Sequence, residues 1–169
     1  MEKTPNPAKA NPADVSSIDA IIAATYDVIS GPAGQARDWE RERSLFLPGA
    51  RLIPTSAKAG ANAPAGKLEP QIYDVEGFIE RSREYVEKNG FYEKEIARRT
   101  EQFGSIAHVW STYESRHRED ELQPFMRGIN SIQLFFDGDR WWVMSIYWQQ
   151  ESPAAPIPES YLTSPALKK

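Results

Sequence analysis

The sequence predicts a single α+β domain in which three helices precede an antiparallel sheet. Apolar residues recur at helical spacing up to Asn89-Gly90 and at alternate positions from Phe91 onward. The length of 169 residues suits one domain that buries its own core without a disulfide or a metal. Helices that precede a run of strands gather on one face of the sheet, and we expect that arrangement here.

Three stretches predict the helices. In the first, 18–29, apolar residues recur at i, i+3, i+4 and i+7, and Gly31-Pro32 ends the pattern. A short second helix is predicted over Arg37–Phe46. The third begins after Asp74, a favourable N-cap residue, and ends at Asn89-Gly90.

From Phe91 onward the period of two predicts strands, and two turns join them into hairpins. Gly104-Ser105 suits a tight turn, and Asp137-Gly138 is typical of a type I′ turn. A short strand at Arg51–Ile53 precedes the third helix. The predicted antiparallel strands are Tyr92–Gln102, Ile106–Arg118, Gly128–Phe136 and Trp141–Gln150.

The turn at Asp137-Gly138 sets which residues of the last two strands share a face. A two-residue turn pairs Leu134 with Trp141, and a four-residue turn leaves the faces unchanged. This face is apolar near the turn and polar further away, so its polar part could line a cavity. Together with the preceding strand, it carries Ser111, Tyr113, Asn130, Ser145 and Tyr147.

The opposite face of this sheet is too apolar to lie in water. We expect a homodimer to cover it. The alternative is that the C-terminal tail or the Pro54–Pro70 loop folds over it. His108 is placed on this face, and the residues predicted to form the dimer contact are Trp110, Trp142, Met144, Ile146 and Trp148.

Biased composition marks both ends of the chain and one internal segment. Residues 1–13 and 152–169 are predicted to be extended or disordered tails, because proline blocks helices and central strands. The Pro54–Pro70 loop is rich in Ala, Gly and Pro, and is either a mobile surface insertion or a lid over a pocket. The domain itself is expected to cover 14–151.

The amino-acid composition also limits the kinds of functional site that the protein could have. The chain has no Cys and only 2 His, which excludes thiolate nucleophiles and iron–sulfur clusters and argues against a metal site. A net charge of −4 argues against nucleic-acid binding, which requires a basic surface. No apolar run is long enough for a membrane span and no secretory signal is visible. We therefore expect a cytoplasmic protein that uses no metal and no cofactor.

Three stretches resemble the nuclear-transport-factor-2-like superfamily, which has a cystatin-like fold. They are Arg37–Ile53 (RDWERERSLFLPGARLI), Gly104–Arg116 (GSIAHVWSTYESR) and Gly128–Gln149 (GINSIQLFFDGDRWWVMSIYWQ). The superfamily includes SnoaL-like polyketide cyclases, ketosteroid isomerases and scytalone dehydratase. The resemblance covers 14–151 and implies a cone-shaped barrel, in which the three helices pack on a strongly curved antiparallel sheet. It leaves the activity open, because this fold hosts enzymes, carrier domains and binding modules.

The resemblance further implies a conical cavity between the first two helices and the concave face of the sheet. Tyr26 of the first helix would project into it. Helical phase places Trp39 and Arg43 of the second helix on the apolar face, where both could contact a ligand. The same phase leaves the acids of that helix, Asp38, Glu40 and Glu42, at its flanks.

For proton transfer a carboxyl group must be desolvated and close to a Tyr or His. Asp38 and His108 are the candidate catalytic residues, and Asp38 or Glu42 could act beside Tyr113 or Tyr147. The leading hypothesis is a dimeric protein that binds a small apolar or aromatic molecule. The alternatives are a cofactor-independent lyase, isomerase or cyclase and a dimerisation module without a ligand. A cavity with an unpaired carboxyl group beside Tyr or His would favour the enzyme, and a fully packed cone would favour the module.

Overall fold

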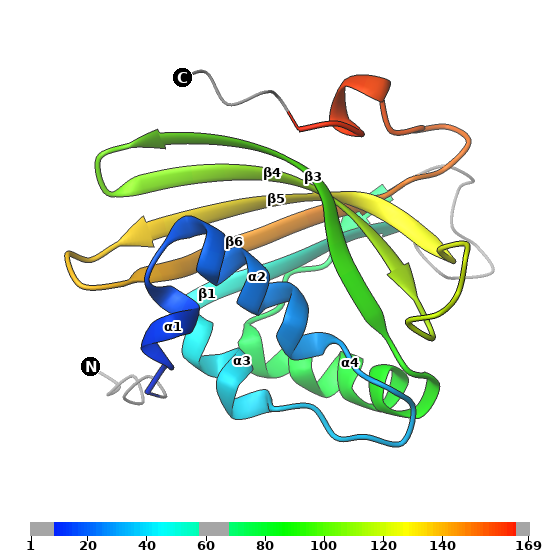
Figure 1. Ribbon diagram of the computed structural model, residues 1–169, viewed down its shortest axis with the longest axis horizontal. Coiled ribbons are helices and arrows are strands. Elements are labelled where there is room, and N and C mark those ends of the chain that lie inside the picture. The colour runs from blue at the N-terminus through cyan, green and yellow to red at the C-terminus, as the bar shows by residue number, and fades with distance from the viewer. Residues whose placement is uncertain (1–8, 58–67, 165–169) are drawn as a thin grey trace.

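A computed structural model describes residues 9–57 and 68–164. One six-stranded sheet, in the order β2-β1-β6-β5-β4-β3, curves over a layer of helices (Figure 1). The helices are α1 (Pro12–Val15), α2 (Ile18–Ile29), α3 (Trp39–Leu45) and α4 (Val75–Asn89), with a 3-10 turn at Glu159–Tyr161. The strands are β1 (Phe46–Ala57), β2 (Leu68–Pro70), β3 (Tyr92–Phe103), β4 (Ile106–Arg116), β5 (Met126–Phe136) and β6 (Trp141–Gln150). The predicted α+β class is confirmed, and the sheet stays open at its β2 and β3 edges.

The helices α2 and α4 lie where the apolar periodicity predicts them, and each begins after a polar N-cap side chain. Ser17 accepts a hydrogen bond from the backbone N–H of Ala20 at the start of α2. Asp74 accepts one from Gly77 at the start of α4. No helix in the described ranges is long and apolar enough to cross a membrane.

The sheet is mixed rather than wholly antiparallel. The short strand expected at Arg51–Ile53 is part of the twelve-residue β1, which runs parallel to β6 with Leu52 opposite Ile146. This strand follows α3 directly, and the chain then crosses back through α4 before the antiparallel strands begin. The ends of the predicted Pro54–Pro70 loop belong to β1 and β2, and its residues 58–67 lie outside the described residues.

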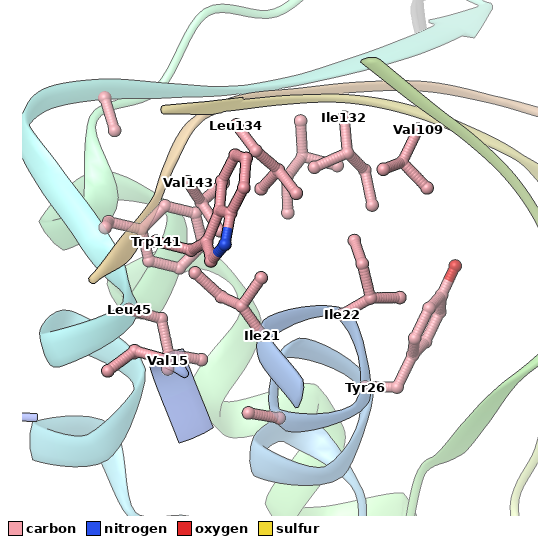
Figure 2. Close-up of a cluster of buried hydrophobic side chains, with 14 of the residues drawn as sticks. Val15, Ile21, Ile22, Tyr26, Leu45, Val109, Ile132, Leu134, Trp141 and Val143 are labelled. Carbon is pink, nitrogen blue, oxygen red and sulfur yellow. The ribbon is translucent and has the colours of Figure 1, made fainter. Parts of the chain in front are cut away.

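The main core lies between α2 and the concave face of the sheet (Figure 2). Ile21 and Ile22 are fully buried against Val109, Ile132 and Val143. Burial of each such side chain contributes about 1.5–3 kcal/mol. Tyr26 lies one turn further along α2 (Figure 2), and its phenol leaves the apolar core to meet the polar side chains of Ser111 and Asn130.

A β-bulge in β6 changes the predicted register. Leu134 lies opposite Val143, as expected for a four-residue turn, but Gln133 lies opposite Ser145. Met144 is therefore an extra residue, and beyond it the two faces of β6 exchange. The prediction that Ser145 and Tyr147 lie on the concave face is wrong, and Tyr147 is 47% exposed on the outer face.

The same bulge moves Ile146 and Trp148 to the concave face. Ile146 is buried in the main core, and Trp148 packs edge-on against Phe78 of α4 at 6.0 Å between ring centres. Neither side chain can therefore belong to a contact on the outer face, which corrects that part of the predicted dimer interface. The homodimer itself stays a prediction.

The strands β4 and β5 pair with the expected parity. Ser111 lies opposite Asn130 and Tyr113 lies opposite Gly128, and the concave-face residues of β4 are buried. His108 and Trp110 alternate with them and lie on the outer face, as predicted. No register shift interrupts this pair, so the alternation holds along the whole of β4.

The C-terminal segment 152–164 covers part of the outer face. The Tyr161 ring lies 5.9 Å from the Trp110 ring, and its carbonyl accepts a hydrogen bond of 2.6 Å from Thr112 Oγ1. The Arg99 guanidinium lies over the Tyr161 ring and donates to the carbonyl of Ser160. This covering is the alternative that the sequence left open, and it crosses β3 and β4 above the sheet (Figure 1).

Candidate functional site

A cavity of about 500 Å³ lies between α2, α3, α4 and the concave face of the sheet. Its volume lies in the range of small-molecule pockets. The apolar part of its wall includes Ile29, Trp39, Phe78, Phe91, Ile146 and Trp148. The polar part includes Tyr26, Glu42, Thr55, Glu93, Tyr113 and Asn130.

Glu42 of α3 is the most deeply buried carboxyl group at this cavity. It is 2% exposed, and its Oε2 has no hydrogen-bond partner. Burial raises its pKa from the ordinary 4.5 to about 8. Glu42 follows Trp39 by three residues, and residues at this spacing share one face of a helix, here the face toward the cavity.

The predicted inward position of Arg43 is wrong. Its guanidinium lies on the surface, where it binds Glu40 at 2.6 Å and Glu76 at 2.6 Å. Asp38 is exposed, and its carboxylate caps α3 by accepting a hydrogen bond from the backbone N–H of Arg41. In α3, Trp39 and Glu42 face the cavity, whereas the ion pairs of Arg43 with Glu40 and Glu76 hold its guanidinium away from it.

Glu93 of β3 is a second carboxyl group in the cavity wall, and the sequence did not single it out. Burial raises its pKa to about 7, and hydrogen bonds from Ser115 and Asn130 partly offset that rise. The bond from Ser115 Oγ measures 2.9 Å. A register shift between Glu95 and Ala97 turns Glu93 toward the cavity. No pattern in the sequence marks this shift, so alternation alone would place Glu93 outside.

Four polar side chains form a hydrogen-bond chain beside Glu93. Asn130 Nδ2 donates to the Tyr26 hydroxyl at 3.0 Å, and this hydroxyl lies 2.7 Å from Ser111 Oγ. Ser111 donates to the carboxylate of Glu95, which binds Arg98. Because Ser111 donates to Glu95, Tyr26 donates to Ser111. Burial raises the pKa of Tyr26, so its phenol stays protonated at neutral pH.

Tyr113 contributes a second phenol to the wall. It is 1% exposed, and its hydroxyl has no hydrogen-bond partner. Burial, followed by the nearby charge of Glu93, raises its pKa, so it also stays protonated. Thr55 Oγ1 in the same wall is likewise buried with no hydrogen-bond partner in the part of the chain that the structure describes. Buried polar atoms are normally paired, so the wall offers hydrogen-bonding capacity that the described protein atoms do not use.

The other residues that the sequence predicts as site residues lie on both faces of the sheet. Tyr26, Trp39, Tyr113 and Asn130 line the cavity, and Ser111 lies directly behind Tyr26. Ser145 and Tyr147 lie on the outer face. His108 also lies outside, with its Nε2 3.2 Å from Ser131 Oγ, so it cannot reach the cavity. Among the described residues no cluster of three or more His, Asp or Glu side chains could hold a metal ion.

Several solved structures have the same arrangement of helices and sheet. A protein of unknown function with a cystatin-like fold from Nostoc punctiforme superposes with a TM-score of 0.58 at 12% identity, over 82% of this chain and 91% of its own. An NTF-2-like protein of unknown function from Silicibacter pomeroyi gives 0.53 at 12% identity, over 80% and 94%. The chain has the nuclear-transport-factor-2-like fold. The expected resemblance is thereby confirmed at the level of the fold.

A third structure with this fold is called a putative ketosteroid isomerase and comes from Parabacteroides distasonis. It gives a TM-score of 0.53 at 10% identity, over 87% of this chain and 98% of its own. No protein-family model matches the chain. No curated protein matches its sequence either. At identities this low, the similarity shows a shared nuclear-transport-factor-2-like fold and nothing about activity. The activity must therefore be inferred from the side chains of the cavity.

Proposed function

We propose that the cavity binds a small, largely apolar molecule that carries polar groups. The observation behind this proposal is the combination of mainly apolar walls with three buried polar atoms that have no hydrogen-bond partner among the described residues: Glu42 Oε2, Tyr113 OH and Thr55 Oγ1. Apolar walls supply affinity, and a few fixed polar groups orient the ligand. In a dimerisation module without a ligand, these buried polar atoms would cost free energy and gain no partner. Apolar side chains at the same positions would avoid that cost.

The two carboxyl groups favour a second candidate function, which is proton transfer on the bound molecule without a cofactor. A general base works best when its pKa lies near the working pH, and burial brings the pKa of Glu93 to about 7 and that of Glu42 to about 8. Tyr113 stays protonated beside Glu93 and has a free hydroxyl. An unpaired carboxyl group in the cavity, with phenols in the same wall, is what an isomerase or lyase requires.

In this second function Glu93 would remove a proton from a carbon next to a carbonyl group. The electron pair of the broken C–H bond moves onto the carbonyl oxygen, and the Tyr113 hydroxyl donates a hydrogen bond to the enolate oxygen that forms. The proton then returns from Glu93 to the same or a neighbouring carbon. One structure with this fold carries the name of a ketosteroid isomerase, and its similarity to this chain is in keeping with such a reaction.

The proposal is tested with one- and two-ring cyclic ketones in deuterated water. Binding is followed by tryptophan fluorescence, and proton exchange next to the carbonyl is followed by NMR. We expect at least one ketone to bind and exchange, and Glu93→Gln to slow the exchange by about 100-fold or more. The matched control Glu101→Gln, exposed on the same strand, should leave it unchanged. Binding without exchange overturns proton transfer alone, and absence of binding overturns both functions.

A further inference from the structure

We propose that the ligand of this cavity is an organic cation, a protonated amine on an aromatic or aliphatic skeleton, held between Glu42, Glu93 and the aromatic wall. The inference rests on the proposed binding function and narrows it to a chemical class. Its basis is the charge of the cavity. Among the described side chains that line it, Glu42 and Glu93 are acidic, and Arg81 is the one basic residue. Arg81 is exposed and lies over the Tyr73 ring, away from both carboxyl groups.

Three other buried or partly buried carboxylates of this chain have an arginine partner. Asp14 binds Arg41 at 2.8 Å, Glu95 binds Arg98 at 2.7 Å, and Glu114 binds Arg116 at 2.6 Å. Such pairing is expected, because an ionised carboxyl group is costly to bury without a cation.

Glu42 and Glu93 differ from these residues. Burial is the one influence on the pKa of Glu42, and no charged group of α2, α3, α4 or the sheet shifts it. Glu93 has hydrogen bonds from Ser115 and Asn130 and likewise no cationic partner. Among the described residues, neither of these two cavity carboxyl groups therefore has a cationic partner. A ligand ammonium group would supply the missing positive charge.

The aromatic wall suits the same class of ligand. Trp39, Phe78, Phe91 and Trp148 line the cavity together with Tyr85. The negative faces of aromatic rings attract ammonium groups, and this attraction strengthens when the site is desolvated. Such rings also bury the apolar skeleton to which the amine is attached. Two carboxyl groups that can ionise beside an ammonium group, within an aromatic wall, thus fit a hydrophobic amine.

Binding of a cationic ligand should also release protons from the two cavity carboxyl groups. Burial keeps a large share of Glu42 and Glu93 protonated near neutral pH. An ammonium group favours the ionised carboxylates and so lowers the pKa of both. Binding of the cation at pH 7 should therefore release protons, whereas binding of an uncharged molecule of equal shape should not. A neutral ligand would instead accept a hydrogen bond from protonated Glu42.

The test compares two matched pairs, 2-phenylethylammonium with 2-phenylethanol and 2-(2-naphthyl)ethylammonium with 2-(2-naphthyl)ethanol. Binding to the full chain is measured by calorimetry at pH 7 and low salt, in two buffers of different ionisation enthalpy. We expect at least one ammonium to bind about tenfold more tightly than its alcohol and to release protons. In Glu42→Gln this preference should fall to about threefold or less, and Glu40→Gln on the same helix should retain it.

Each outcome decides between the two proposals. Tighter or equal binding of the alcohols overturns the amine class and leaves small-molecule binding intact. An ammonium preference that survives in both Glu42→Gln and Glu93→Gln places the cation elsewhere and also overturns the inference. If neither series binds, both the amine class and the proposed binding function are contradicted. Circular dichroism of each variant establishes that a lost preference does not come from unfolding.

Discussion

Gly128 lies directly opposite Tyr113 on the neighbouring strand, and a Cβ atom at Gly128 would come within 2.5 Å of the Tyr113 hydroxyl. The same Cβ would come within 2.5 Å of the carbonyl oxygen of Gln149. Glycine is therefore required at this position because any side chain displaces either the phenol or the backbone of β6. The absence of a side chain at Gly128 leaves room for the Tyr113 hydroxyl.

Gly128→Ala should destabilise the protein by about 1–3 kcal/mol, the usual cost of forcing an extra group into a packed site. Urea unfolding followed by circular dichroism measures this loss. The variant should also weaken ligand binding, since Tyr113 must shift. A free energy of unfolding within about 0.5 kcal/mol of the wild type would contradict the close approach of the two residues.

Stability should fall as the pH rises from about 4.5 to about 8, because Glu42 and Glu93 have raised pKa values in the folded state. A folded protein that holds more protons than the unfolded chain loses stability as those protons dissociate. Their contribution is complete below the ordinary pKa of 4.5 and is lost as the pH passes the folded values. Groups with lowered pKa values, such as Glu76 and Glu114, act in the opposite direction, below about pH 4.5.

Glu42→Gln should remove most of this slope and stabilise the protein at pH 8, by on the order of 1–3 kcal/mol. Chemical denaturation at several pH values measures the effect, and Glu40→Gln is the matched exposed control on α3. An unchanged slope in Glu42→Gln would show that this carboxyl group is not held protonated by burial.

Tyr147 and Trp148 are neighbours in sequence on opposite faces of β6. Trp148→Ala should cost about 3–5 kcal/mol, because it removes a cavity-lining ring that packs on Phe78. Tyr147→Ala should cost less than about 1 kcal/mol, because this side chain is 47% exposed. The reverse order of these two losses, measured by urea unfolding, would mean that the bulge at Met144 is absent.

We expect a homodimer through the part of the outer face that the C-terminal segment leaves free. Ile106 and Met144 are 60% and 40% exposed there. Met144→Glu should shift the protein toward the monomer, because a charge is costly in an apolar contact. Leu122→Glu is the control, because Leu122 is 91% exposed on the loop between β4 and β5. Sedimentation of the wild type as a monomer at micromolar concentration would refute the dimer.

The helices and the apolar core could be predicted from sequence because their signals are local. The stripe of α2 and the turn at Asp137-Gly138 belong to contiguous residues, and each predicts its element without knowledge of the rest. Asn130 could likewise be named as a cavity residue from the alternation along its strand, whereas Tyr26 is placed there by the resemblance to the superfamily.

Glu93, Ser145 and Tyr147 could not be placed correctly, because their faces depend on register shifts. One shift lies between Glu95 and Ala97, and the other follows Val143. A bulge depends on how neighbouring strands twist and pack, which single-strand alternation does not record. Glu42 shows the same limit in a helix, since helical phase alone does not predict that Glu40 and Glu76 hold Arg43 at the surface while Glu42 faces the cavity.

The most direct measurement is calorimetric binding of the ketone and amine series to wild-type protein and to Ser82→Trp. Ser82 lines the cavity, so a tryptophan there should fill it, whereas Glu80→Trp adds the same ring at an exposed position of α4. We predict that at least one compound binds the wild type and Glu80→Trp with one-to-one stoichiometry, and that Ser82→Trp loses this binding. If no compound binds the wild type, or if Ser82→Trp binds as tightly, the cavity is not a ligand site.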